Sequence, residues 1–275
     1  MSIKSMSQDD LRLVLDWAAD EGWNPGIDDA QVFYNTDPSG FLIKWEQGHP
    51  AAAISVVNHS DSFAFLGLYI AHPRFRGQGH GLDVWRAGLA HAGNRTVGLD
   101  GVPAQQGNYV RSGFAYAGST NRYSGMIDFA GNKAAIMTQD DLPSVLNADR
   151  SLMGLDRKAF LEPWLNGCSS RKTFILSEGA NTISYVTARE CRRGVKVGPM
   201  VAYTASQVEY LLGSVADAFP GETFYIDVPG RSTDLVELLE DRGFVPVFET
   251  ARMYLGQAPR GNPQPFEAVA TLELG

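Results

Sequence analysis

Three glycines at alternate positions, Gly77, Gly79 and Gly81, follow a run of apolar and aromatic residues at 63–70. The run predicts a strand with both faces buried, and the residues after the glycines have helical spacing. The N-terminus of a helix has backbone N–H groups without partners and the positive end of the helix dipole. Glycines before it allow a large anion to approach the main chain closely. The segment therefore predicts a cradle for a phosphate or pyrophosphate group.

Two well-known phosphate-binding patterns do not fit this segment. A P-loop needs a Lys-Ser or Lys-Thr pair after its glycines, and no such pair follows them here. A dinucleotide-binding fold needs G-x-G-x-x-G after its first strand and an acidic residue about 20 residues further on. Asp100 lies at about that distance, but the glycine spacing is G-x-G-x-G and about sixty residues precede the strand. Neither triphosphate hydrolysis nor dinucleotide binding is predicted.

The order of these features resembles motif A of the GNAT superfamily of acyl-CoA-dependent N-acyltransferases. The apolar strand is followed by Pro73, then by an arginine of the motif (Arg74 or Arg76), then by the glycines. The segment 108–114 resembles the closing GNAT signature, in which a tyrosine (here Tyr109) precedes a Gly-Phe pair by four residues. With the segments GWNPG and FETARMY, the whole chain looks like the bacterial two-lobed GNAT proteins. The resemblance implies transfer of an acetyl group from acetyl-CoA to a primary amine of a small molecule or peptide, by direct attack.

The resemblance also implies which residues hold the donor. The main chain of 77–82 would bind the pyrophosphate of coenzyme A, and the preceding strand would pair with the pantetheine arm and offer an oxyanion donor. One such donor typically contributes about 3–4 kcal/mol to the rate. His80 is expected to face solvent and to contribute only its N–H. The implied cofactor-binding residues are Tyr69, Ile70, Ala71, Arg76, Gly77, Gln78, Gly79, His80, Gly81, Leu82 and Asn108.

Tyr109 occupies the general-acid position of the family. Its phenol, with an ordinary pKa of about 10, can protonate a departing thiolate; the alternative is a packed aromatic side chain on an amphipathic helix. The general base is not identified by the sequence. Asp100 is a catalytic candidate, Glu21 and Asp227 are others, and water alone can relay the proton. The residues expected to bind the acceptor are Glu21, Trp23, Asp28 and Asp227, although a capped turn with a packed tryptophan also explains the first three.

A rival function is a non-catalytic acyl-CoA-binding sensor or ligand-binding module. A purely structural protein with a vestigial site is less favoured, because three glycines cost folding entropy. Cys168 and Cys191 do not have the spacing of a metal site, and no His-rich pattern accompanies them, so no metal is expected. The sequence also lacks a G-x-S-x-G elbow, which favours direct transfer without an acyl-enzyme.

An internal repeat divides the chain into two copies of about 130 residues. MSQDDL at 6–11 recurs as MTQDDL 131 residues later, and LGLYIA at 66–71 recurs as VGPMVA at the same offset. The Gly-Phe pair at 113–114 recurs 130 residues later.

Two domains are therefore expected, a catalytic GNAT domain at 1–128 that carries the acyl-CoA loop, and a degenerate GNAT-like domain at 134–275. The second copy lacks the glycine loop after residue 202, so it is expected to shape the acceptor pocket or a dimer contact instead of holding a pyrophosphate.

The expected fold class is α/β (α+β), with tandem GNAT folds. Each copy is expected to have a mixed, mostly antiparallel twisted sheet flanked by helices. Helices are predicted at 10–21, 28–35, 140–149, 157–165, 206–218 and 233–242. Strands are predicted at 41–45, 51–57, 63–70, 96–100, 122–127, 173–177, 182–188, 195–201, 223–228 and 246–254, with a loop at 101–107.

The composition sets broader limits. The chain has 275 residues, of which 44% are hydrophobic and 20% charged, as in soluble globular proteins. A net charge of −8 does not favour a nucleic-acid or membrane partner, and it suits a cationic amine acceptor. No run approaches 18 apolar residues, and the first residues lack the apolar stretch of a signal peptide. We therefore expect a cytoplasmic monomer or homodimer.

Overall fold

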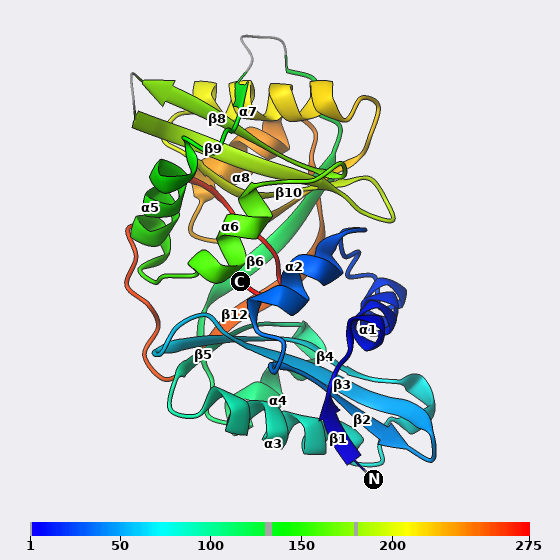
Figure 1. The fold of residues 1–275 in the computed structure, drawn as a ribbon. Helices are drawn as coiled ribbons and strands as arrows, with labels where there is room; N and C mark the ends of the chain where they lie inside the picture. The colour runs from blue at the N-terminus through cyan, green and yellow to red at the C-terminus, as the bar shows by residue number, and fades with distance from the viewer. Residues whose placement is uncertain (1, 130–133, 179–180) are drawn as a thin grey trace.

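The computed structural model describes residues 2–129, 134–178 and 181–275. In these residues the strands form one sheet of 13 strands, with helices packed on both faces. Figure 1 shows two halves, one above the other, joined by long strands that run between them. We call residues 2–129 the first half and residues 134–275 the second half.

The first half begins with a short edge strand and two helices, followed by the strands and helices that contain the glycine loop. Its elements are β1 (Ser2–Ser5), α1 (Gln8–Asp20), α2 (Asp29–Thr36), β2 (Phe41–Glu46), β3 (His49–Asn58), β4 (Phe63–Ala71), the 3-10 helix η1 (Pro73–Phe75), α3 (His80–Ala92), β5 (Thr96–Gly101), the 3-10 helix η2 (Pro103–Gln105), α4 (Gln106–Arg111) and β6 (Ala115–Gly125).

The second half repeats this order of helices and strands, as the internal repeat in the sequence suggests, and adds a short final strand. Its elements are β7 (Ala135–Ile136), α5 (Leu142–Met153), α6 (Lys158–Leu165), β8 (Arg171–Glu178), β9 (Asn181–Glu190), β10 (Val195–Ala202), α7 (Ala205–Ala218), β11 (Phe224–Pro229), α8 (Thr233–Asp241), β12 (Val245–Leu255) and β13 (Phe266–Ala268).

The predicted fold class is confirmed, because the sheet is mixed and most of its neighbouring strands are antiparallel. Only β4 with β5 and β10 with β11 pair in parallel within the described residues. The sequence analysis missed β1, β7 and β13, placed the start of β6 seven residues too late, and assigned a loop where η2 and the start of α4 lie. The three missed strands are two to four residues long, too short for a clear alternating pattern.

Local sequence explains how α1 begins. The Ser7 hydroxyl accepts a hydrogen bond from the Asp10 N–H (3.1 Å), and the Asp10 carboxylate accepts one from the Ser7 N–H (2.9 Å). This reciprocal capping box satisfies two backbone donors at the start of the helix. One face of α1 is buried through Leu11, Val14 and Leu15, as its spacing predicts.

The two halves exchange their last strands. β12, from the second half, lies between β5 and β6 of the first half, and β6 in turn pairs with β11 of the second half. Figure 1 shows both strands running between the halves. Each half therefore completes its part of the sheet with a strand from the other.

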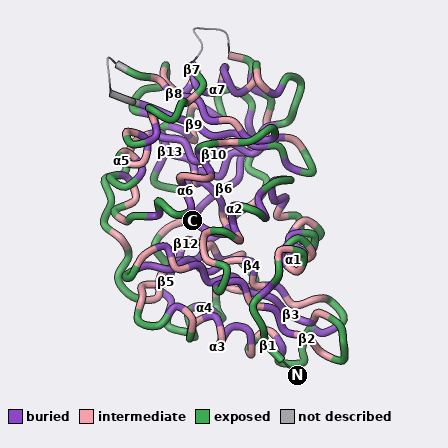
Figure 2. The backbone as a smooth tube through the Cα atoms, viewed as in Figure 1, coloured by how far each residue is buried: buried purple, intermediate pink, exposed green. Residues whose placement is uncertain are grey.

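The interface between the halves is a hydrophobic core. One cluster of buried side chains combines α1 and α2 with α5 and α6. In it, the rings of Phe33 and Trp164 stack with centroids 6.1 Å apart. Figure 2 shows buried chain continuing through the centre from one half to the other. Because apolar burial is the main favourable term in folding, we expect the two halves to unfold together.

The chain from 266 to 275, called here the closing segment, lies between the two halves. β13 pairs antiparallel with β10, where Met200 faces Ala268. The next residue, Val269, donates its N–H to the Asp227 carbonyl of β11 (2.9 Å). The segment therefore fills the space between β10 and β11 before it crosses to the first half.

The closing segment passes a corresponding glycine in each half. A Cβ atom on Gly198 would collide with the carbonyl oxygen of Val269, and a Cβ atom on Gly67 would collide with that of Glu273. The two glycines are 131 residues apart, which is the offset of the sequence repeat. Glycine is therefore required at both positions by close approach of the main chain.

Candidate active site

The glycine loop has the geometry that an anion cradle needs. Gly77 and Gly79 have φ angles of 74° and 83°, a region that L-residues with side chains rarely adopt. Gly79 precedes the first residue of α3. In the described parts of the chain, the backbone N–H groups of 77–82 donate no hydrogen bond to the protein. They are therefore available to an anion at the N-terminus of α3.

The side chains around this loop are arranged differently from the simplest expectation. Arg76 donates from Nε to the Ala71 carbonyl (3.0 Å) and forms an ion pair through Nη2 with Glu21. The prediction that His80 faces solvent is wrong, because its side chain is buried edge-on against Phe75, with centroids 5.8 Å apart. His80 is the first residue of α3, and its side chain turns into the core.

Three of the expected loop residues have plain structural contacts. The side-chain amide of Gln78 donates to the Arg74 carbonyl (3.1 Å). A Cβ atom on Gly81 would lie 2.9 Å from the Tyr69 hydroxyl, so glycine lets this tyrosine pass. Leu82 is exposed.

β4 and β5 separate beside this loop. Their parallel pairing ends at Leu66 and Leu99. Beyond it, Ile70 and Ala71 pair with β3 on one side only, and no strand in the described residues covers their other side. The corresponding edge of β10, in the second half, is covered by β13. The first half thus has an open strand edge where the second half has a filled one.

A cavity lies where β4 and β5 separate. Its walls come from these two strands, from the connection between α1 and α2, and from β12 and the closing segment of the second half. The lining residues are Trp23, Leu66, Gly67, Leu68, Tyr69, Leu99, Asp100, Val102, Gln105, Tyr109, Phe248, Thr250, Leu272 and Glu273.

Tyr109 lies in this cavity on α4. Its ring stacks on Trp85 of α3, with centroids 5.5 Å apart and an angle of 17° between the planes. Burial, followed by the neighbouring Tyr69, raises the pKa of the Tyr109 phenol above its ordinary value. The phenol is therefore protonated at neutral pH and can donate a proton. Asn108, on the exposed side of α4, donates to the Gln105 side chain (2.6 Å).

The two aspartates at the ends of corresponding strands make matching ion pairs. Asp100 of β5 accepts two hydrogen bonds from Arg252 of β12 (2.9 and 2.7 Å). Asp227 of β11 accepts two from Arg122 of β6 (2.7 and 3.0 Å). Each pair joins an exchanged strand to the opposite half. Asp100 lines the cavity, whereas Asp227 does not.

These pairs also set the charge states of their members. Burial raises the pKa of Asp100 above its ordinary value, and Arg252 only partly offsets this. For Asp227, burial is outweighed by Arg122 and Lys196, so its pKa is lowered. Both carboxylates are saturated by their arginines, which leaves neither with a free oxygen for an acceptor.

The connection between α1 and α2 is held by the second half. The Trp23 carbonyl accepts hydrogen bonds from Lys196 (2.8 Å) and Arg122 (3.0 Å). The Asn24 side chain bonds to the main chain of Arg193 through both its oxygen and its nitrogen (3.2 and 2.8 Å). Trp23 is thus fixed over the cavity, whereas Glu21 pairs with Arg76 outside it.

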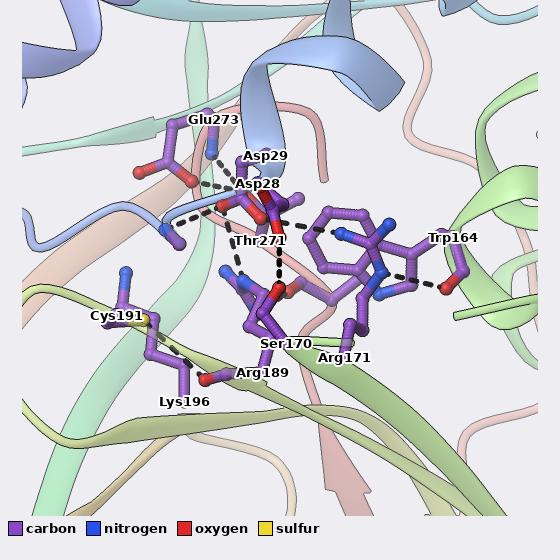
Figure 3. A network of polar contacts seen from close by, with 12 residues as sticks. Asp28, Asp29, Trp164, Ser170, Arg171, Arg189, Cys191, Lys196, Thr271 and Glu273 are labelled. Atoms are coloured by element: carbon purple, nitrogen blue, oxygen red, sulfur yellow. Dashed lines mark hydrogen bonds and ion pairs between the residues drawn. The ribbon is translucent and has the colours of Figure 1, made fainter. Parts of the chain in front are cut away.

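Asp28 belongs to a separate polar network between α2 and the strands of the second half, shown in Figure 3. It accepts a hydrogen bond from the Ser170 hydroxyl (2.6 Å). Its neighbour Asp29 accepts from Arg189 (3.2 Å), and Arg171 lies 3.7 Å away. Asp28 does not line the cavity; its contacts join the two halves.

Sequence reasoning missed the cavity residues that the second half supplies, namely Phe248, Thr250, Leu272 and Glu273. They lie about 150 residues or more from the glycine loop, and no motif surrounds them. The one available signal was the repeated glycine in LGLYIA and VGPMVA, which marks where the closing segment passes.

Two searches for other kinds of site found nothing in the described ranges. Among residues 2–129, 134–178 and 181–275, no three His, Cys, Asp or Glu side chains gather as a metal ion would need. In the same ranges, every helix is too short or too polar to cross a membrane.

Comparisons with known proteins agree with this geometry. Residues 9–114 match the acetyltransferase (GNAT) family, and residues 145–265 match an acetyltransferase (GNAT) domain. The chain is 32% identical to the holothin acyltransferase of Pseudoalteromonas sp. (strain SANK 73390), over 99% of this chain and 94% of the relative.

Solved structures share the fold. The structure of a putative acetyltransferase from Pyrococcus horikoshii superposes with a TM-score of 0.82 and 20% identity, over 100% of this chain and 95% of that one. A GCN5-related N-acetyltransferase from Sphaerobacter thermophilus gives a TM-score of 0.63 and 13% identity, over 96% and 98% of the two chains.

These matches define the class of protein as an acyl-transferring enzyme, not the binding module considered above. The chain belongs to the GNAT acyltransferase family, as its motifs suggested.

Proposed function

We propose that this protein transfers an acetyl group from acetyl-CoA to a primary amine, and that the first half (1–128) carries out the reaction while the second half (134–275) completes the acceptor site. The observation that carries the proposal is the run of unbonded N–H groups at 77–82, directly beside the open edge of β4. That edge leads into the cavity that holds Tyr109. Diphosphate, pantetheine and thioester would occupy these three places in order.

The chemistry follows from these positions. The main-chain amides hold the diphosphate, and Arg76, half exposed at the loop, adds a positive charge next to it. Backbone groups at Tyr69–Ala71 pair with the pantetheine arm, and one N–H there stabilises the oxyanion as negative charge develops. The amine attacks the thioester carbonyl directly, and the protonated Tyr109 phenol gives its proton to the departing thiolate.

The acceptor is proposed to be a small molecule. The cavity is closed on the acceptor side by Trp23, by Phe248 and Thr250 of β12, and by the closing segment. An extended peptide would have to displace several of these walls. The relationship to a holothin acyltransferase makes holothin the first amine to test.

Donor binding is tested by titration calorimetry with acetyl-CoA. We expect micromolar affinity and one site per chain, because β13 fills the corresponding space in the second half. Gly79→Asp should abolish binding, since it places a carboxylate at the diphosphate, and Arg76→Ala should weaken it. Gly48→Asp is the matched control, because Gly48 has a similar φ of 78° in an open turn away from the loop.

Transfer is tested by the release of free thiol from acetyl-CoA. The acceptors would be holothin, polyamines, amino acids, aminoglycosides and peptides with free N-termini. Wild-type protein that binds acetyl-CoA but releases thiol with none of these amines would contradict the proposed amine transfer. No binding at millimolar acetyl-CoA would contradict the donor site itself.

A further inference from the structure

Two carboxylates line the cavity, and their surroundings differ. Asp100 has both oxygens bonded to Arg252, and the pair ties β5 to β12. Glu273, in the closing segment, receives one hydrogen bond from the Thr271 hydroxyl at Oε2, and the same hydroxyl oxygen accepts from the Glu273 N–H (3.0 Å). Figure 3 shows this local pair at the edge of the polar network. No arginine or lysine forms an ion pair with Glu273 in the described residues.

The closing segment holds Glu273 in a fixed place. Before it, the Ala270 carbonyl accepts from Arg189 (3.1 Å). After it, the Leu274 carbonyl lies 2.8 Å from the His59 ring nitrogen Nε2, and the Gly275 carbonyl accepts from Arg157. Gly67 leaves room for the Glu273 main chain. Only 2% of Glu273 is exposed, so its side chain is directed by these anchors and not by solvent.

Charged groups from neighbouring strands surround Glu273. Its carboxylate acts on Asp100 from β5, on Arg122 from β6, on Arg189 from β9 and on Lys196 from β10. For Lys196, burial and Arg122 lower the pKa, and the Glu273 and Asp227 carboxylates oppose the shift. The positive members of this group favour the ionised form of Glu273.

We propose that Glu273 is the general base, accepting the proton of the acceptor amine. The inference rests on the proposed function and names a residue from the closing segment for a step that the first half does not supply. A carboxylate in a buried cavity is a suitable base when it faces the proton that it removes. A catalytic carboxylate also gives the cavity a preference for amines that enter as cations.

The protons and electrons balance as follows. The ammonium form of the acceptor gives one proton to the Glu273 carboxylate, and the neutral nitrogen attacks the thioester carbonyl carbon. A C–N bond forms, the C–S bond breaks, and its electron pair goes to sulfur. The Tyr109 hydroxyl protonates the thiolate, and the phenolate takes the second proton from nitrogen. Glu273 then releases its proton to solvent.

The test compares Glu273→Gln, Glu273→Asp and Glu249→Gln in the thiol-release assay, with the amine that the wild-type protein acylates best. Glu249 is the matched control, because it is an exposed glutamate next to Phe248 and Thr250 on β12. We expect Glu273→Gln to lower kcat/KM by about 10²-fold or more and to remove the acid limb of its pH profile. Glu273→Asp should keep the acid limb and part of the activity, and Glu249→Gln should match the wild type.

Two readouts separate a base from a structural residue. Affinity for acetyl-CoA and the thermal unfolding midpoint should be unchanged in Glu273→Gln if the residue acts in proton transfer. Wild-type activity and an unaltered acid limb in Glu273→Gln would overturn this inference alone, as would a parallel loss of folding and donor binding in both Glu273 variants. Failure of the wild-type protein to acylate any amine would overturn the proposed function first.

Discussion

The main-chain oxygen of Glu273 lies against Gly67, at the place where any side chain on residue 67 would begin. The contact joins the closing segment of the second half to the strand that faces the donor cavity. Val269 makes the matching contact with Gly198 in the second half. One stretch of chain therefore fills the opened sheet of one copy and forms a wall of the active cavity in the other.

Replacing Gly67 by Ala should separate the closing segment from β4. Overpacking of this kind typically costs about 1–3 kcal/mol, and we expect a matching loss in the free energy of unfolding, measured in urea. Thiol release should fall as well, because Glu273 and Leu272 would move, whereas acetyl-CoA affinity should fall less.

Gly107→Ala is the matched control for this change. Gly107 is an exposed glycine in α4, and a Cβ atom there would meet only the Arg111 side chain at 3.7 Å. Alanine should be neutral or slightly stabilising at this helical position. Equal stability of the Gly67→Ala and wild-type proteins would show that the closing segment can move away freely.

Replacing Asp100 by Asn should act mainly on stability. It leaves the buried Arg252 guanidinium without its partner, and breaking a buried pair in this way typically costs about 3–5 kcal/mol. Equilibrium unfolding in urea measures the loss. The double variant Asp100→Asn/Arg252→Met should recover part of it, because no unpaired charge remains.

Asp9→Asn provides the contrasting surface case, since the side chains of Asp9 and Arg12 are 90% and 58% exposed. The loss there should be at most about 1 kcal/mol. A normal unfolding curve for Asp100→Asn together with a lost kcat would instead support the catalytic role first expected for Asp100.

The sequence could predict the features that depend on neighbouring residues. The positive φ angles of Gly77 and Gly79 follow from their place between a strand and a helix, and Ser7 has the residue type and spacing of a helix cap. The repeat also predicted a second copy of the same element order. These signals are local or compare one local segment with another.

The strand exchange could not be predicted in the same way. β6 and β12 both have the pattern of a closing strand, and that pattern is the same whichever half supplies the partner. The buried pairs Asp100–Arg252 and Asp227–Arg122 show the exchange only once the partners are known. β13 is three residues long and follows several prolines, so the wall that it helps to form has no periodic signal.

Replacing Tyr109 by Phe tests the proton donor. We expect kcat to fall by about 10²–10⁴-fold, with acetyl-CoA affinity unchanged, because the ring still stacks on Trp85. Because burial raises the pKa of Tyr109, the phenol should stay protonated and the alkaline limb of kcat should not begin below about pH 10. Tyr116→Phe, at a tyrosine that is 63% exposed on β6, should behave as wild type. Full activity in Tyr109→Phe would assign this ring to packing.

His59 should make the fold sensitive to acid. Its pKa is lowered from 6.5 to about 4, chiefly by burial, and the Arg157 guanidinium adds to the shift. The Leu274 carbonyl and the carboxylates of Asp149 and Asp37 oppose it. The folded protein therefore prefers the neutral ring, and the contact with Leu274 holds the closing segment next to Glu273.

The sign of the effect follows from proton linkage. A depressed histidine pKa means that the unfolded chain binds the proton more tightly, so stability present above pH 6.5 is lost as the pH falls toward about 4. At pH 4.5 the loss should be about 2–3 kcal/mol. Urea unfolding of the wild type and of His59→Gln, at pH 7 and pH 4.5, measures it, because other groups titrate equally in both proteins.

His59→Gln keeps a donor for the Leu274 carbonyl but does not titrate, so its stability should change less between the two pH values, by about 2–3 kcal/mol. His49→Gln, at an exposed position of β3, should leave the wild-type difference intact. Thiol release at pH 4.5 should follow the same order, since an acid-loosened closing segment removes Glu273 from the cavity. Equal pH dependence in the wild type and His59→Gln would mean that another buried group controls the acid response.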